Sequence, residues 1–236
     1  MPAQPNQSLA DGVTLLGALC ASGQAIGTRE MARLMGWEPT RANRLLGTLK
    51  NLGLAEQDGD RRYRPGPAIH LLATQCLQGS GLLGAALPVV RNLLKPDFGF
   101  ALGVLWQGRV CYLLHAAPGQ PIEEGLRRSA LYPAEDSSIG MVLESTIDGP
   151  ARTSAAERAR IRKRTYAIQR NNDGQTGSVA VAIHGARAGD PPCAAIAVMA
   201  NYTQHPPESL AALLHPACIE IAQRLHGAGH DRPIDR

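Results

Sequence analysis

The sequence has no apolar run long enough to cross a membrane. No stretch of about 18 consecutive apolar residues occurs in the chain, and a membrane-spanning helix needs about that many. The first eight residues are polar and lack the apolar core of a secretory signal. We therefore expect a cytoplasmic protein with no membrane partner.

Cysteines and enzyme motifs are scarce as well. The five cysteines include no Cys-x-x-Cys pair, which argues against a disulfide framework and a zinc site and favours free thiols in a reducing compartment. Neither G-x-S-x-G nor G-x-x-x-x-G-K occurs. Residues 79–84 fit G-x-G-x-x-G, but no strand is predicted before them and no acid follows about 20 residues later, as a dinucleotide site requires. The sequence predicts no cofactor, no metal and no catalytic residue.

The balance of charge is only mildly basic. The chain has 24 basic and 20 acidic residues, a net charge of +4, and its only lysines are Lys50, Lys95 and Lys163. Such an excess permits an anionic partner without requiring one, so the distribution of charge must decide. The planar guanidinium group of arginine can form two parallel hydrogen bonds to phosphate or guanine, although a preference for arginine over lysine can also result from the base composition of the genome.

The first third of the chain predicts a helical domain with a small hairpin. Apolar spacing and capping residues favour helices over residues 11–21, 28–35 and 40–52. A hairpin with its turn at Gly59-Asp60 is expected over residues 54–64, and a linking helix over residues 68–78. We assign residues 1–78 to this first domain.

A glycine-rich stretch opens a second domain, over residues 79–236. Helices are expected at residues 82–94, 137–145, 154–164 and 208–225, and strands at residues 100–106, 109–116, 178–183 and 193–200. Gln107-Gly108 between the first two strands is a hairpin signal. The whole chain therefore predicts an α+β fold with an antiparallel sheet in the second domain.

Residues 28–50 meet several independent requirements of a helix-turn-helix. Its fifth position must be small where the helices touch, and it is Ala32; its ninth favours a left-handed backbone, and it is Gly36. The inward positions are all apolar: Met31, Met35, Trp37, Ala42 and Leu45.

The surface around the second of these helices has residue types suited to double-stranded DNA. The expected contacts in the two helices are Thr28, Arg29, Thr40, Arg41, Asn43, Arg44, Thr48 and Lys50. Arginine pairs well with guanine and asparagine with adenine in the major groove. The hairpin adds the wing residues Arg61, Arg62 and Arg64 as phosphate contacts. One alternative stays open: a helix-turn-helix used only for packing or protein contact, with the arginines as a solvated face.

Residues 36–49, 53–56 and 62–67 resemble the IclR family of regulators. They are similar to its R-L-L-x-T-L helix, its G-L-V-E segment and its Y-R-L-G-P wing exit, over roughly residues 9–73. The resemblance implies a winged helix-turn-helix followed by a GAF-like effector domain, in a repressor or activator that forms a dimer or tetramer. It also implies a small organic effector.

The second domain resembles the family less closely. Residues 133–143 are similar to L-P-L-H-A-T-A-L-G-K-A-L-L, with Glu135 where histidine is usual, and the segment at residues 144–162 is shorter than in the family. Residues 162–167, 178–183 and 195–200 are similar to R-x-x-G-Y-A, C-I-A-x-P-I and A-L-S-I-S-G.

The resemblance places an effector pocket in this domain. Its expected lining is Trp106, Tyr112, His115, Glu135, Ser137, Ser138, Met141, Ser178, Ala197 and Met199. Because Ala197 and Met199 make one strand face apolar, we expect a larger and less polar ligand than a compact anion. A collapsed pocket without a ligand is one alternative. An enzyme that uses residues 85–226 is the other, although the sequence shows no nucleophile–base pair for it.

Overall fold

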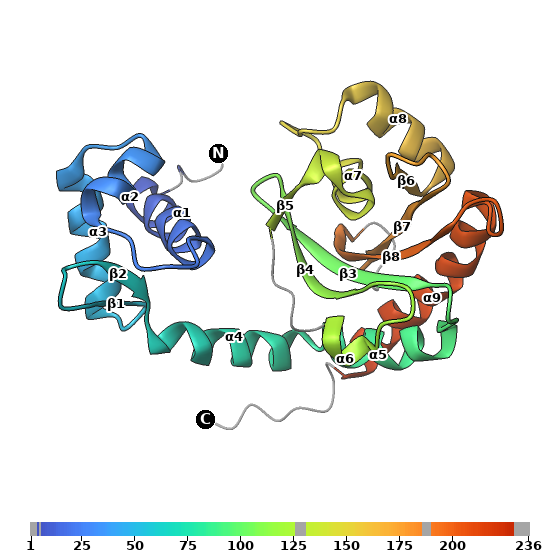
Figure 1. Cartoon of the computed structure of the whole chain (residues 1–236), viewed down its shortest axis with the longest axis horizontal. Helices are drawn as coiled ribbons and strands as arrows, with labels where there is room; N and C mark the ends of the chain where they lie inside the picture. Colours follow the sequence, from blue (N-terminus) through green and yellow to red (C-terminus); the bar gives the residue numbers. More distant parts are fainter. Residues whose placement is uncertain (1–3, 5, 126–130, 186–189, 229–236) are drawn as a thin grey trace. The chain divides into compact units, whose positions relative to one another are not determined.

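The computed structural model divides the chain into two compact units, Met1–Gly79 and Ser80–Arg236 (Figure 1). The structure describes residue 4 and residues 6–125, 131–185 and 190–228. Within these ranges, no helix combines the length and the apolar character that a bilayer crossing needs.

The first unit is a three-helix domain with a two-stranded hairpin and a following helix (Figure 1). Its elements are α1 (Gln7–Ala21), α2 (Thr28–Met35), α3 (Pro39–Asn51), β1 (Ala55–Gln57), β2 (Tyr63–Pro65) and α4 (Pro67–Ser80). Helix α1 begins four residues before the predicted start, because the Asn6 side chain accepts the Leu9 N–H and caps it. Gly36 ends α2 with φ 66°, as the turn position requires.

The core of this unit fixes how α3 is presented. Leu15, Met31 and Leu46 are fully buried between the three helices. The small residues Ala32 and Ala42 are also buried, which allows α2 and α3 to approach closely. The predicted inward positions thus form or border the core, and the opposite side of α3 faces outward.

The second unit is built on an antiparallel sheet of order β5-β4-β3-β8-β7-β6. The strands are β3 (Gly99–Trp106), β4 (Arg109–Ala116), β5 (Leu131–Pro133), β6 (Ala167–Arg170), β7 (Thr176–His184) and β8 (Pro192–Asn201). The helical segments are α5 (Leu82–Leu93), α6 (Ile122–Gly125), η1 (Ala134–Asp136), α7 (Ser138–Glu144), α8 (Ala155–Arg164) and α9 (Pro207–Ala228).

Side-chain alternation divides the second unit into two cores. Phe100, Leu102 and Val198 pack with α5 and α9 on one face of the sheet. Ala101 and Ala197, one residue out of phase, pack with α7 on the other. The small alanines bring α7 close to the sheet, on the face that also carries a cavity lined by Tyr112 and Met199.

The predicted elements of this unit are present, but four short segments were not predicted: α6, β5, η1 and β6. Each has three or four residues, too few for a periodic pattern to appear in the sequence. The predicted hairpin turn is confirmed, because Gln107 (φ 49°) and Gly108 (φ 69°) both have left-handed backbone.

Candidate nucleic-acid interface and ligand cavity

The outward face of α3 has the polar residues that the sequence predicted for it. Thr40, Asn43 and Arg44 are exposed, and in the part of the chain that the structure describes Arg44 forms no ion pair. Thr48 and Lys50 are also exposed, but the Thr48 hydroxyl donates to the Arg44 carbonyl (3.0 Å) and Lys50 Nζ donates to Gln57 (3.0 Å). Asn43 and Arg44 therefore remain available to an external partner.

Arg41 differs from the prediction that it lies on this outward face. Its guanidinium pairs with the Asp11 carboxylate of α1 and lies 4.5 Å from the centroid of the Trp37 ring. Gln7 donates to the other oxygen of Asp11 (2.8 Å). The hydrogen bonds from Arg41 and then Gln7 lower the pKa of Asp11, so the carboxylate stays charged. Arg41 therefore fastens α3 to α1, and the contact with DNA that the sequence suggested for it stays a prediction.

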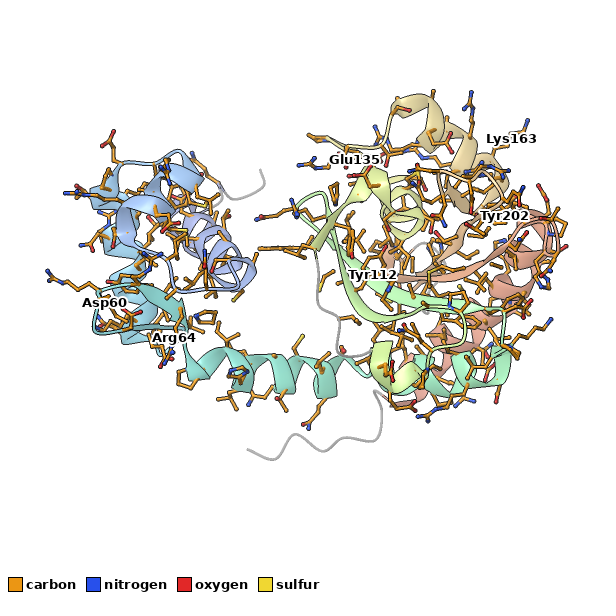
Figure 2. All side chains as sticks on the ribbon, viewed as in Figure 1. Asp60, Arg64, Tyr112, Glu135, Lys163 and Tyr202 are labelled. Carbon is orange, nitrogen blue, oxygen red and sulfur yellow. The ribbon has the colours of Figure 1, made fainter. Side chains whose placement is uncertain are left out.

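The wing has one anchored arginine and two exposed ones. Arg62 donates from Nε to the Ala25 carbonyl (2.9 Å) and pairs with Glu30 of α2 (3.0 Å), so it fastens the hairpin to the helices. Arg64 is exposed and pairs with Glu56 (Figure 2). Arg61, exposed at the turn with φ 58°, forms no ion pair with the described residues.

Helix α2 contributes further cations beside the wing. Thr28 is half-buried at the N-terminus of α2, and Arg29 is exposed. Arg33, which was not among the predicted contacts, is exposed on the same helix. Over the described ranges neither arginine forms an ion pair, so both remain available to an anionic partner. The periodicity of α2 could have identified Arg33, because it lies one turn after Arg29.

The second unit contains a cavity of about 610 Å³, within the size range of small-molecule sites. Five predicted residues line it: Tyr112, His115, Ser137, Ser178 and Met199. The other lining residues are Asp97, Pro118, Tyr132, Asp136, Gln169, Asn171, Thr176, Gly177, Ala200 and Asn201. The cavity is open in this structure, and most of its side chains are polar. Polar side chains thus surround the apolar Met199, and the expectation of a larger and less polar ligand stays a prediction.

Hydrogen bonds and ring contacts order one wall of the cavity. The Tyr112 hydroxyl lies 2.8 Å from Ser137 Oγ, and Ser137 also caps α7 by accepting the Gly140 N–H (3.3 Å). The Tyr112 ring contacts Tyr132 at 5.2 Å between centroids (Figure 2). Burial raises the pKa of Tyr112, so it remains a neutral hydroxyl that can donate and accept.

The other five predicted lining residues lie outside the cavity. Trp106 is exposed near the end of β3, and Met141 and Ala197 are buried in the core under α7. Glu135 pairs with Arg152 (3.0 Å). Ser138 is buried, and its hydroxyl oxygen lies 2.7 Å from Oγ of Ser178, which lines the cavity. Ala197 shares the sheet face of Met199, but α7, which carries Ser138 and Met141, covers it.

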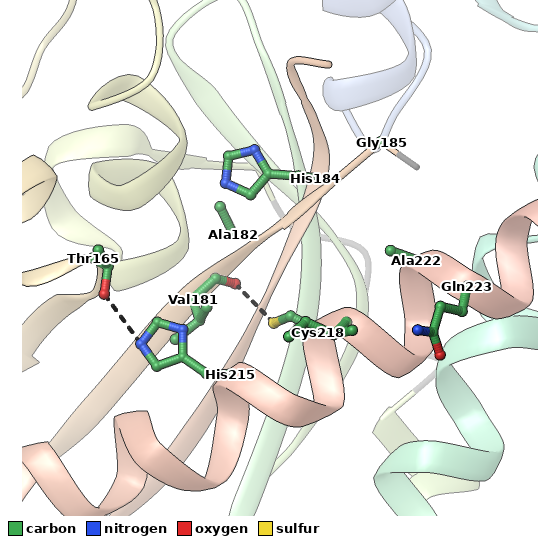
Figure 3. Close-up of a pocket in the computed structure, with 10 residues that line it drawn as sticks. Thr165, Val181, Ala182, His184, Gly185, His215, Cys218, Ala222 and Gln223 are labelled. Carbon is green, nitrogen blue, oxygen red and sulfur yellow. Dashed lines mark hydrogen bonds between the residues drawn. The ribbon is translucent and has the colours of Figure 1, made fainter. Parts of the chain in front are cut away.

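A second cavity, of about 570 Å³, lies between β7 and α9 (Figure 3). His215 Nε2 is 3.1 Å from the Thr165 hydroxyl, and Cys218 Sγ is 3.7 Å from the Val181 carbonyl oxygen. Burial raises the pKa of Cys218 to about 12, so the thiol is protonated near neutral pH and a poor nucleophile. This cavity therefore gives no support to a cysteine-dependent enzyme.

The arginines between residues 152 and 164 have structural partners. Arg162 donates to the Ser145 carbonyl (2.5 Å), Arg158 donates to the Ile147 carbonyl (3.3 Å), and Arg164 pairs with Glu157 (2.8 Å). Arg158 and Arg162 thus join α8 to the loop before it, and Arg164 pairs within α8, which leaves few cations of this helix for an external partner.

Comparison with known proteins gives consistent results. Residues 8–59 match the model of the IclR helix-turn-helix domain. The glycerol operon regulatory protein of Streptomyces coelicolor is 29% identical over 153 residues, which span 64% of this chain and 60% of that protein.

Two solved structures resemble the chain over nearly its whole length. The IclR transcriptional regulator from Alicyclobacillus acidocaldarius has a TM-score of 0.67 at 18% identity, over 94% of this chain and 100% of that one. An IclR homolog of Microbacterium hydrocarbonoxydans, complexed with 4-hydroxybenzoate, has a TM-score of 0.63 at 20% identity, over 93% and 99% of the two chains. These likenesses confirm the predicted fold class.

Proposed function

We propose that this chain, whose residues 8–59 match the IclR helix-turn-helix domain, is a sequence-specific transcriptional regulator controlled by a small organic effector. The observation that carries the proposal is the exposed face of α3, where Asn43 is exposed and Arg44 is exposed without an ion pair to a described residue. Regulation of an operon fits the name of the Streptomyces coelicolor relative.

The first unit binds double-stranded DNA with α3 in the major groove. Arg44 suits the O6/N7 edge of guanine and Asn43 suits adenine. Arg29, Arg33 and Arg61 contact phosphates beside the groove. Arg41 acts as a positioning residue, because its pair with Asp11 fixes α3 on α1. Arg62 does the same for the wing.

A second copy of the chain is the proposed protein partner. Helix α4 has 14 residues and none is buried. Leu71, Leu72 and Leu77 are 59%, 52% and 43% exposed, and so many exposed leucines on one helix favour a helix–helix interface. A symmetric dimer would place two α3 helices on half-sites about one DNA turn apart, and a tetramer would pair two such dimers.

The second unit holds the effector in the cavity beside Tyr112 and Ser178. The homolog from Microbacterium hydrocarbonoxydans is a relative of the same fold that binds a small organic molecule. An effector changes operator affinity only if it binds the DNA-competent and DNA-incompetent states with different affinities.

The test is selection of a DNA sequence by the full chain, followed by anisotropy titrations and footprinting. The proposal expects one enriched motif with two inverted half-sites and protection in the major groove. Enrichment of no motif, or equal affinity for the motif and a scrambled duplex, would contradict it.

A further inference from the structure

The cavity of about 610 Å³ in the second unit differs chemically from a site for an anion. Two carboxylates, Asp97 and Asp136, line it, and among the described lining residues there is no lysine or arginine. His205 Nε2 lies 2.5 Å from Asp97; this bond lowers the pKa of Asp97, so the carboxylate keeps its charge. An anionic ligand would meet repulsion from both carboxylates.

The neutral polar groups of the lining outnumber the charged ones. Amides come from Gln169, Asn171 and Asn201, and hydroxyls from Tyr112, Tyr132, Ser137, Thr176 and Ser178. Amides and hydroxyls both donate and accept, whereas carboxylates only accept. This mixture matches a ligand whose own groups also do both, as alcohol hydroxyls do.

Several of these groups are available to a ligand. The side chains of Asp136 and Gln169 form no hydrogen bond with another described residue. Asn201 Oδ1 accepts from the Thr203 N–H (2.8 Å), which leaves its amide nitrogen for a ligand. The rings of Tyr112 and Tyr132 add apolar surface on the same wall, against which the C–H groups of a ligand can pack.

We propose that the effector of this chain is an uncharged polyhydroxylated molecule, a sugar or sugar alcohol. An organic cation fits less well, because it would only donate hydrogen bonds or make none, so the amide N–H and hydroxyl groups of the lining would lack acceptors. The proposal rests on the proposed function only in treating this cavity as the effector site.

The experiment measures binding to the full chain by calorimetry and thermal shift. The probes are D-glucose, D-xylose, mannitol and sucrose, with succinate and benzoate as anions and putrescine and choline as cations. At least one uncharged probe should bind saturably. Asp136→Ala should weaken that binding roughly tenfold, because two acceptor oxygens are lost. Gln169→Ala should weaken it as well.

Asp148→Ala is the matched control, because Asp148 is also an exposed aspartate of the second unit and does not line the cavity. It should leave the affinity unchanged. Asp136→Ala should improve the binding of any anion by removing repulsion, so the sign of its effect identifies the ligand class. Binding of only anions or only cations overturns the proposal, as does the failure of every uncharged probe. Operator binding without effector, measured on the same variants, tests the proposed function separately.

Discussion

Replacing Arg44 with alanine tests which residue of α3 reads the DNA sequence. Arg44 is exposed and has no ion pair in the described part of the chain, so its loss should change the free energy of unfolding by less than about 0.5 kcal/mol. A bidentate contact to guanine contributes about 1–3 kcal/mol. Operator affinity should therefore fall about 5- to 160-fold, while affinity for a scrambled duplex should change little.

The assay is fluorescence anisotropy with the selected operator, its scrambled form and single-base variants at constant salt. The reasoning requires that the Arg44→Ala protein tolerate every base at one operator position. A loss of equal size on operator and scrambled duplex would mean that Arg44 contacts only phosphate. No loss on either duplex would refute the placement of α3 in the groove.

Three further predictions concern the Asp11–Arg41 pair, the proposed interface on α4 and the buried thiol of Cys218. Asp11→Asn should lower the thermal midpoint of unfolding and reduce discrimination between operator and scrambled duplex, because Arg41 loses its charged partner. Asp148→Asn is the control. Unchanged discrimination in Asp11→Asn would contradict the positioning role of Arg41. Since the folded-state pKa of Asp11 is lowered, the wild-type pair should persist at neutral pH and weaken only as pH falls below the ordinary range of an aspartate, which a denaturation series in acid would detect. Leu71→Glu should shift the chain toward the monomer in light scattering, whereas Leu71→Met, which keeps the apolar surface, should not; an unchanged mass for Leu71→Glu would argue against α4 as the interface. Burial raises the pKa of Cys218 from 9.0 to about 12, so between these pH values the thiol ionises in the unfolded chain but not in the folded one. The free energy of unfolding should therefore fall by up to about 1.4 kcal/mol per pH unit as pH rises through this window. Cys218→Ala should make this dependence on pH shallower, and an unaltered slope would exclude Cys218 as its cause.

The sequence was sufficient where local rules decide the structure. Gly36, Ala32 and the apolar positions around them predict the helix-turn-helix because each acts on its near neighbours. Gln107-Gly108 predicts the hairpin turn for the same reason. The roles of Asp11 and Ala25 could not be predicted locally, because their arginine partners Arg41 and Arg62 lie 30 and 37 positions away.

The cavity lining shows the same division. Gly99 pairs with Met199 across antiparallel strands, and this register brings Asp97, just before β3, to the same end of the sheet as Asn201, the last residue of β8. To predict that lining, one must know that two strands about 100 residues apart in the sequence pair with each other. The residue pattern within a single strand does not reveal its partner. The family resemblance pointed to residues 195–200, of which only the last two, Met199 and Ala200, line the cavity.

The most direct test of the DNA-binding surface is the salt dependence of operator affinity. If Arg29, Arg33 and Arg61 of each subunit neutralise phosphates, a dimer releases counterions from about six contacts, and log K against log salt should have a slope of roughly −5. Arg61→Ala should make the slope shallower by about 2, because a dimer loses two contacts, and Arg44→Ala should leave it unchanged. A flat response to salt in the wild-type chain would contradict the account.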